Sequence, residues 1–513
     1  MPNRLELTVA PEAADEKGLR QAAALSLGVS EDRVTAVIPR RRSVDARHRK
    51  VRVNYAVDVY VDESPDESTL ELPHLATLTG PPSVVVIGAG PAGLFAAWCL
   101  ASKGVRAVVV ERGSDVRGRR PALAQLNRDG RLNAESNYCF GEGGAGTFSD
   151  GKLYTRVKKG PIRQVMELLV GAGAPSKILV EARPHIGTNR LPKVIATFRE
   201  YLKAAGVEFL FDTRVDRLSL NGTKIAGVEL ADGSVIVCES VVLATGHSAR
   251  DVYRTMLGQG VPMESKPLAI GVRIEHPQMV IDRIQYGAHA GHANLGAAPY
   301  SLKRTVEGVG VYSFCMCPGG FIVPASTEEG HVVVNGMSPS RRDSEFANSG
   351  MVVTVDQSVF GAEPLDGVAY QSVIEKAAFQ AGGGRYVAPA QRVTDFLAGR
   401  VSTDLPRCSY RPGLASADLK EVLPERIWSP LRDALAEFGQ RKMRGYLSEE
   451  AVLVGVESRS SSPVRILREP GSLESPGIAG LYPCGEGAGY AGGIMSAAID
   501  GLRVANAIAA KSA

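Results

Sequence analysis

The stretch VVVIGAGPAG, residues 84–93, decides the fold of this 513-residue chain. Its apolar residues predict a buried strand, and a helix predicted for 94–103 follows directly after a glycine turn. In such a turn the first glycine permits the tight bend, the second lets the backbone approach a pyrophosphate, and the third lets the helix pack close to its strand. Free N–H groups at the helix N-terminus favour phosphate. The predicted dinucleotide contacts of this turn are Gly88, Gly90, Pro91, Ala92 and Gly93.

A second apolar strand, predicted for 105–110, ends at Glu111. This acid stands 111 − 88 = 23 positions after Gly88, where a carboxylate binds the ribose hydroxyls in dinucleotide folds. A glycine-rich structural turn alone does not explain the acid. Strand, turn, helix, strand and acid in register therefore predict an α/β fold of Rossmann type.

Composition narrows the classes of protein. The net charge of +4 neither demands nor excludes a polyanionic partner. No apolar run approaches the roughly 18 residues of a membrane span, so no membrane partner is predicted. Seven cysteines without framework spacing predict reduced thiols and a cytoplasmic protein. No Cys-x-x-Cys pair is present to bind zinc, and no metal site is predicted.

Changes of pattern along the chain predict four segments. Residues 1–76 predict a small α+β N-terminal domain of β-α-β-β order, ferredoxin-like, followed by a proline-rich linker over 65–82. Residues 83–260 and 471–513 are predicted as the first and closing parts of the dinucleotide domain. Residues 261–470 predict an inserted α+β substrate domain of short strands, with helices over 346–360 and 368–379.

Three glycine-rich segments are predicted to complete the site. The loop at 140–153 has no apolar strand before it, so we interpret it as a loop that lies flat against a pyrophosphate or a planar ring. A buried strand ends at 245–246, and the segment 480–494 leads from a short strand into a long C-terminal helix. The predicted contacts are Gly143, Gly144, Ala145, Gly146, Thr245, Gly246, Gly485, Glu486, Gly492, Gly493 and Ile494.

The closing segment separates two cofactor classes. A nicotinamide dehydrogenase has no use for it, whereas FAD would place a ribityl hydroxyl against Glu486 and its ring at the positive N-terminus of the last helix. The arrangement resembles the glutathione-reductase-type FAD fold. That resemblance implies two further contacts, Arg112 beside the ribose acid and Val215 near the adenine.

Further motifs make the resemblance more specific. They are RSVDAR at 42–47, residues 137–153, GHSARD at 246–251, GVRIEHP at 271–277, FCMCPGG at 314–320 and VESRSSSP at 456–463. With the closing glycine segment, the chain resembles the uncharacterised FAD-dependent dehydrogenase family of bacteria and plastids over nearly its whole length. The resemblance implies a bound FAD in a Rossmann-like FAD-binding domain, but it supplies no substrate.

Candidate catalytic residues carry weaker signals. Lys152 would place a cation near the ring, with a solvated loop lysine as the alternative. His247 is an acid/base candidate because histidine titrates near neutrality, and Tyr490 would cover a flavin face or donate a proton. A structural histidine and plain packing are their alternatives. Cys315 and Cys317 share one face of a predicted strand, but with Cα atoms too far apart for an easy disulfide. Buried structural thiols are therefore predicted, with a catalytic dithiol as the alternative.

Arg459 and a basic cluster in the N-terminal domain each allow two interpretations. Arg459 in its serine-rich turn either holds an anionic substrate group or pins its own loop. A basic cluster in the N-terminal domain is either a solvated hairpin face or a docking site for an acidic partner. No aromatic residues alternate with it, so nucleic acid is not predicted as a partner. The cluster comprises Arg40, Arg41, Arg42, Arg47, Arg49, Lys50 and Arg52.

The leading hypothesis is an FAD-dependent oxidoreductase that moves a hydride between flavin N5 and a small organic substrate. No second strand–glycine–helix–acid unit is present, so the reductant would be the substrate, transiently docked NAD(P)H or a protein electron donor. An FAD-dependent monooxygenase is the first alternative, although Thr245-Gly246 and Gly485-Glu486 stand where those enzymes carry Asp-Gly and Gly-Asp. The second alternative is a flavin-containing binding or redox-sensing protein.

Overall fold

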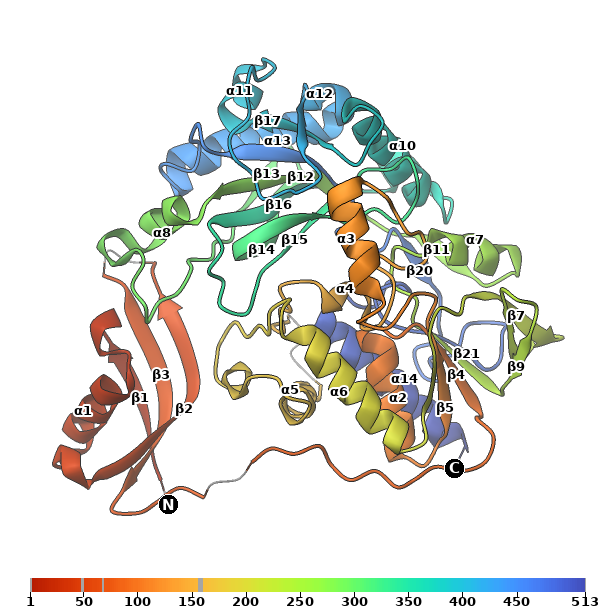
Figure 1. Cartoon of the computed structure of the whole chain (residues 1–513), viewed down its shortest axis with the longest axis horizontal. Coiled ribbons are helices and arrows are strands. Elements are labelled where there is room, and N and C mark those ends of the chain that lie inside the picture. The colour runs from red at the N-terminus through yellow and green to blue at the C-terminus, as the bar shows by residue number, and fades with distance from the viewer. Residues whose placement is uncertain (1, 48–49, 67–68, 156–159, 513) are drawn as a thin grey trace.

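A parallel five-stranded sheet forms the lower right part of the molecule (Figure 1). The computed structural model of the chain describes residues 2–47, 50–66, 69–155 and 160–512. The strand order is β21-β10-β4-β5-β6, and every neighbouring pair is parallel. The predicted α/β class with a parallel sheet is thus confirmed. The strands are β4 (Val84–Ile87), β5 (Ala107–Val110), β6 (Glu208–Leu210), β10 (Ser240–Leu243) and β21 (Leu481–Pro483).

The central strand β4 is buried on both faces, which explains its unbroken apolar sequence. Val84 and Val86 point into one core and Val85 and Ile87 into the other. Helices α2 (Pro91–Ser102), α6 (Leu191–Ala204) and α14 (Ile494–Ser512) pack in the first core. The antiparallel sheet of β7 (Val215–Asn221), β8 (Lys224–Leu230) and β9 (Val235–Val237), together with α7 (Arg250–Gly258), packs in the second.

A larger mixed sheet lies above the parallel one (Figure 1). Its strands run in the order β13-β14-β16-β12-β19-β17-β18, with β15 paired to β14. Helices α10 (Asp366–Ala381), α11 (Val393–Ala398), α12 (Leu419–Val422) and α13 (Glu425–Glu437) lie above it in Figure 1. The strands are β12 (Leu268–Pro277), β13 (Lys303–Val306), β14 (Val309–Pro324), β15 (Val334–Met337), β16 (Phe346–Val355), β17 (Ala388–Arg392), β18 (Leu414–Ser416) and β19 (Val452–Glu457).

The helix predicted for 346–360 is wrong over most of its length. Phe346–Val355 is strand β16, between β12 and β14, and only Gln357–Phe360 is helical, as α9. The sequence MVVTV ending this strand is rich in β-branched residues, which favour a sheet between two neighbours. The second predicted helix lies within α10.

The N-terminal unit contains β1 (Asn3–Val9), α1 (Glu16–Leu27), β2 (Val34–Asp45) and β3 (Arg52–Val61), in the predicted β-α-β-β order. Its antiparallel sheet has the order β1-β3-β2. A complete ferredoxin-like fold would add a second helix and a fourth strand, and the described part of residues 2–66 contains neither. After it, residues 69–82 run without helix or strand along the bottom of Figure 1.

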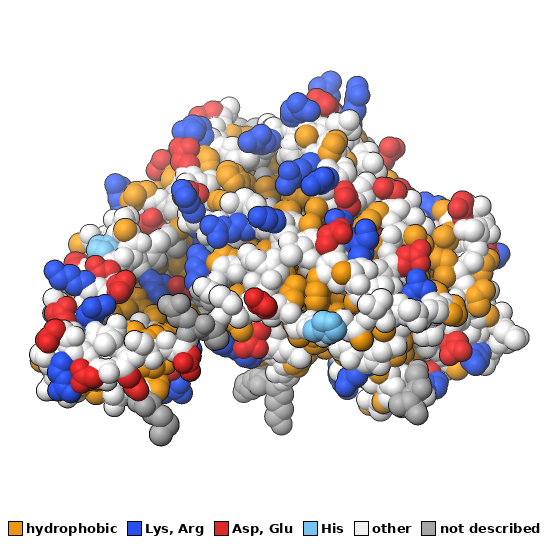
Figure 2. Space-filling view, turned by 60° about the horizontal axis from the view of Figure 1, so that its bottom comes forward, with side chains coloured by type: hydrophobic (Ala, Val, Ile, Leu, Met, Phe, Trp, Pro, Cys, Tyr) orange, Lys and Arg blue, Asp and Glu red, His pale blue; other side chains and the backbone are white. Residues whose placement is uncertain are grey.

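Three of the seven residues of the predicted basic cluster are paired with acids. Arg40 pairs with Asp58, Arg42 with Glu181 and Arg47 with Asp45. Arg49 lies outside the described residues. Figure 2 shows acidic and basic side chains interspersed over this unit, at the left of the view, so the face seen there does not carry charges of a single sign.

Among the described helices, none is long and apolar enough to cross a membrane.

Gly93 provides a test of the predicted turn. A Cβ there would lie 1.9 Å from the backbone oxygen of Gly88. We expect Gly93→Ala to lower the free energy of unfolding by about 1–3 kcal/mol, the usual cost of overpacking, measured by urea denaturation. The control is Gly258→Ala, where a Cβ meets nothing within 4 Å, and its stability should stay unchanged or rise slightly. Equal effects of the two substitutions would contradict this account of the turn.

Candidate functional site

A cavity opens at the carboxyl ends of β4, β5 and β10, where they face β14 and β15 of the upper sheet. Ligands of open α/β sheets bind at this end of the strands. Most of the residues predicted from the sequence line it together. They are Gly88, Gly90, Pro91, Ala92, Glu111, Arg112, Gly144, Ala145, Gly146, Lys152, Val215, Thr245, Gly246, His247, Glu486, Gly492, Gly493 and Ile494.

Four predicted residues are not among the described residues that line the cavity. Gly93, Gly143 and Gly485 lie behind its wall, where a Cβ would lie within 3 Å of Gly88, Thr147 or Ala92 respectively. The Arg468 guanidinium stacks on Tyr490, with its central carbon 3.7 Å from the centroid of the tyrosine ring. This arginine occupies one face of the ring, and the expected role of Tyr490 at the flavin stays a prediction.

The carboxylate of Glu111 is buried and accepts three backbone N–H groups. Ala89 donates to one oxygen at 2.9 Å, and Gly113 and Gly141 donate to the other at 3.0 and 2.9 Å. A carboxylate has about four lone-pair positions, so about one stays open toward the cavity. Glu111 thus fixes three loops in place and retains an acceptor for a ligand hydroxyl.

Several glycines of the wall border open space. A Cβ at Gly246, Gly492 or Gly493 would meet no atom within 4 Å, and one at Gly90 would meet only Gly144, at 4.0 Å. Side chains at these positions would fill the cavity instead. The wall is therefore a backbone cradle that a flat or extended ligand can approach closely.

Two arginines hold the neighbouring loops. Arg112 donates to Glu135 and Asp251 and stacks on the ring of Phe140, so its charge is largely satisfied by protein. Arg119 is fully buried and donates to three backbone oxygens, of Asn137, Glu142 and Gly144. Burial lowers the pKa of Arg119 to about 10. Sequence reasoning missed Arg119, because no local pattern indicates that a helix residue reaches into a distant loop.

Lys152 reaches two sulfur atoms rather than solvent. Its Nζ lies 3.5 Å from Cys315 Sγ, 3.6 Å from Cys317 Sγ and 4.0 Å from an oxygen of Asp150. Burial opposes the charged form, but the nearby sulfur and carboxylate atoms raise the pKa of Lys152 above its usual value. The solvated-lysine interpretation is thereby excluded, and Asp150, itself paired with Arg342, joins the site.

Glu486 and His247 form a pair on the opposite wall. His247 Nδ1 lies 3.5 Å from Glu486 Oε1, and its Nε2 lies 3.0 Å from the backbone oxygen of Arg459. Burial raises the pKa of Glu486, and His247 and Lys266 partly oppose that effect. The predicted acid/base group and the predicted hydroxyl acceptor are thus in contact.

A buried ion cluster supports the wall next to this pair. Both carboxylate oxygens of Glu375 accept hydrogen bonds from Arg250 and Arg459, over distances of 2.7 to 3.2 Å. Burial would raise the pKa of Glu375, but the guanidinium groups of Arg459 and Arg250 lower it to about 2. Arg459 therefore pins its loop, the second of its two interpretations.

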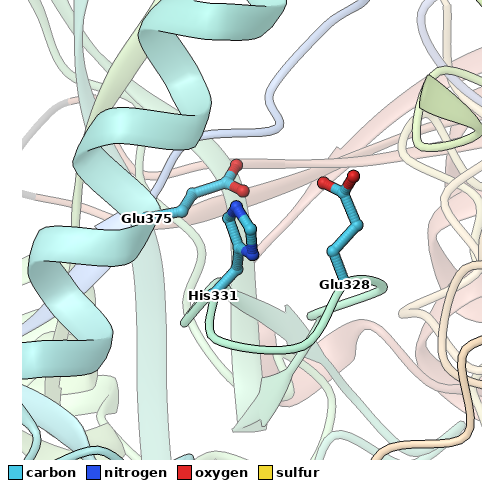
Figure 3. Close-up of side chains that lie close together, drawn as sticks. All are labelled: Glu328, His331 and Glu375. Carbon is cyan, nitrogen blue, oxygen red and sulfur yellow. The ribbon is translucent and has the colours of Figure 1, made fainter. Parts of the chain in front are cut away.

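Glu328, His331 and Glu375 place ligand atoms within 4.8 Å of one another, the spacing of a metal site. Figure 3 shows Glu375 on α10 and the other two on the loop that follows β14. Arg250 binds both carboxylates, and the His331 ring contacts Ser372 and the backbone of Glu329. The ligand atoms are already used, so the cluster is interpreted as structural ion pairing.

Comparisons with known proteins cover nearly the whole length of the chain. A family described as FAD-dependent protein, C-terminal domain-like, matches residues 267–460, and FAD dependent oxidoreductase families match 83–249 and 184–348. A domain of unknown function matches residues 1–60. An uncharacterized protein of Clostridium beijerinckii is 43% identical over 505 residues, 94% of each chain.

More distant relatives match a smaller part of this chain. The protein FixC of Escherichia coli is 31% identical over 216 residues, 42% of this chain and 48% of FixC. A probable electron transfer flavoprotein-quinone oxidoreductase of the same species, YdiS, is 26% identical over 225 residues, again 42% and 48%. Among solved structures, glycine oxidase from Bacillus cereus matches 84% of this chain and 95% of its own, at 13% identity and a TM-score of 0.32. At that score the likeness carries no argument.

Glu375 gives a pH-dependent prediction. Because its pKa lies near 2 in the folded protein and near 4.5 when unperturbed, its contribution is complete above about pH 4.5 and is lost as the pH falls toward 2. Glu375→Gln removes the buried counter-charge that the Arg250 and Arg459 guanidinium groups share, leaves them only the partly exposed Glu328, and should cost about 3–5 kcal/mol at pH 7. We expect the difference in free energy of unfolding between wild type and Glu375→Gln, measured by urea denaturation, to become smaller as the pH falls from 4.5 to 2.

The matched control is Glu363→Gln, an exposed position just before the same helix. It should differ little from wild type at pH 7. A gap between wild type and Glu375→Gln that stays constant down to pH 2 would contradict the ion-cluster account.

Proposed function

The chain belongs to a family of FAD-dependent oxidoreductases, and we propose that it transfers a hydride between flavin N5 and an organic substrate held beneath the upper sheet. The cavity carries this proposal, because one continuous wall joins the glycine turn of the lower sheet to Lys152 and to residues of the upper sheet. The first part suits a dinucleotide, and the second leaves room for a substrate.

The residues present fit FAD. The N-terminus of α2, after Gly90, offers free N–H groups to the pyrophosphate, and Glu111 retains an acceptor for a ribose hydroxyl. We assign the adenine to the side of Val215. The ribityl chain and ring are assigned to Glu486 and the open glycines of 492–493. The bound flavin supplies two-electron chemistry at N5.

The protein's own residues would position the substrate and balance charge. Asn335 and Ser460 line the part of the cavity nearest the upper sheet and offer polar groups for orientation. The Lys152 ammonium places a buried positive charge in the same wall, where it stabilises a negatively charged group far more than in water. The His247–Glu486 pair is placed to hold or deliver a proton at the ring edge.

The electron donor is the second part of the proposal. Of the two relatives that match about two fifths of this chain, one is named as a probable electron transfer flavoprotein-quinone oxidoreductase. That name supports a protein electron partner as the second candidate, beside transiently docked NAD(P)H. The monooxygenase alternative and the redox-sensing alternative are separated from both by the experiment below.

The purified protein titrated with NADPH in the absence of oxygen tests the electron donor. Bleaching of the flavin band near about 450 nm identifies the nicotinamide as reductant. A flavin band that ignores NADPH but bleaches with a reduced electron-transfer protein identifies the second candidate. Rapid NADPH oxidation only with oxygen and a phenolic substrate would favour the monooxygenase, and failure of every donor would favour the redox-sensing protein.

Glu111→Gln tests the assignment of the adenosine end. Its amide NH2 would face the backbone donor of Ala89 or the donors of Gly113 and Gly141, so the loops lose a buried hydrogen bond. We expect FAD to bind about tenfold more weakly, the effect of roughly 1.4 kcal/mol, and the FAD occupancy of the purified protein, from the ratio of visible to ultraviolet absorbance, to fall as a result. The exposed Glu239→Gln serves as control and should keep full occupancy. Equal occupancy in both variants would place FAD elsewhere.

A further inference from the structure

The two cysteines of β14 are the feature of the cavity that the proposed function does not use. Cys315 lines the cavity, and Cys317 is fully buried behind it. Both sulfur atoms lie within 3.6 Å of the same nitrogen, Lys152 Nζ, and the two thiols lie within hydrogen-bonding reach of each other. Lys152 belongs to the glycine loop that lines the same cavity.

An irregularity in β14 brings the two cysteine side chains close together. The pairing of β14 with β16 shifts between Phe314 and Cys317, and Cys315 has φ = 45°, in the left-handed region that residues other than glycine rarely adopt. Such conformations persist where the surroundings hold them, and they cluster at functional sites. The regular-strand geometry behind the sequence prediction of inert thiols therefore does not apply to this pair.

The surroundings hold the bulge and favour one negative charge on it. The Arg273 guanidinium, fully buried, donates to the Cys315 backbone oxygen at 3.4 Å and to Asn348 and Glu457 at 2.6 and 2.7 Å. The hydrogen bond from Cys317 lowers the pKa of Cys315, with Lys152 and Arg273 acting in the same direction. The same hydrogen bond raises the pKa of Cys317.

Four of the other five thiols differ, and the fifth, Cys139, lines the cavity as well. Burial raises the pKa of Cys99, Cys238, Cys408 and Cys484, as expected for structural cysteines in apolar surroundings. Cys315 instead combines access to the cavity with an adjacent ammonium group, which is the environment of a reactive thiol.

We propose that Cys315 and Cys317 form a redox-active dithiol that exchanges two electrons with the flavin bound in this cavity. The proposal rests on the FAD position of the proposed function. In the oxidising direction the Cys315 thiolate and the Cys317 thiol form an S–S bond and release two electrons and one proton. Oxidised FAD is the acceptor and takes up both electrons and the proton, which yields the anionic reduced flavin and balances charge. Lys152 stabilises the thiolate before the step.

An anaerobic dithionite titration of the air-oxidised holoprotein tests this. Wild type should consume two equivalents of this two-electron reductant per flavin, one for the flavin and one for the disulfide. Cys317→Ser should consume one equivalent, and the control Cys238→Ala should still consume two. Bleaching of the flavin in every variant separates the dithiol from FAD binding itself.

Thiol mapping of the unmutated protein gives a second readout that depends on no variant. Alkylation under denaturing conditions should label all seven cysteines after reduction and 7 − 2 = 5 after oxidation, with the two unlabelled residues on the peptide that contains Cys315 and Cys317. Seven labelled cysteines in the oxidised holoprotein, together with one equivalent in the titration and normal bleaching, would overturn the dithiol and leave the proposed function standing.

Discussion

Three backbone N–H groups from three different loops converge on the buried carboxylate of Glu111. In a low-dielectric interior each of these hydrogen bonds to a charged acceptor is strong, and each donor would be costly to leave unpaired. The first glycine turn, the end of β5 and the second glycine loop are thereby held in one arrangement. That second loop continues to Lys152, so the position of the ammonium group depends on the same carboxylate. The cofactor wall and the candidate redox pair are consequences of one interaction.

Buried arginines make the junction between the two sheets rigid. Arg119 holds the second glycine loop through backbone oxygens, Arg273 holds the bulge of β14, and Arg250 and Arg459 share Glu375 beneath the loop near His247. Each is fixed by hydrogen bonds in several directions, which suits the planar guanidinium better than an ammonium group. The result is a cavity whose polar wall is pre-organised before a ligand enters, the arrangement that electrostatic stabilisation of a developing charge requires.

Local patterns in the sequence were sufficient for the lower sheet and insufficient for the upper one. The run 84–93 with Glu111 is specified by neighbours in sequence, so strand, turn and helix follow from propensity and glycine geometry. By contrast, β16 was taken for a helix because its apolar pattern reflects two neighbouring strands that are remote in sequence. The environment on which the proposed role of Cys315 rests has no sequence signal for a similar reason, because the bulge and the approach of Lys152 across 163 positions are tertiary features. The stacking of Arg468 on the ring of Tyr490 likewise has no sequence signal.

A crystal structure of the protein with FAD would test the central claim most directly, namely that one cavity between the two sheets places the flavin beside Lys152 and Cys315. The account predicts electron density for the pyrophosphate at the N-terminus of α2, the ribose at Glu111, and the ring between the 144–152 loop and the 492–494 segment, in contact with the Lys152–Cys315 wall. Density for the ring outside this cavity, or a ring turned away from β14, would contradict it.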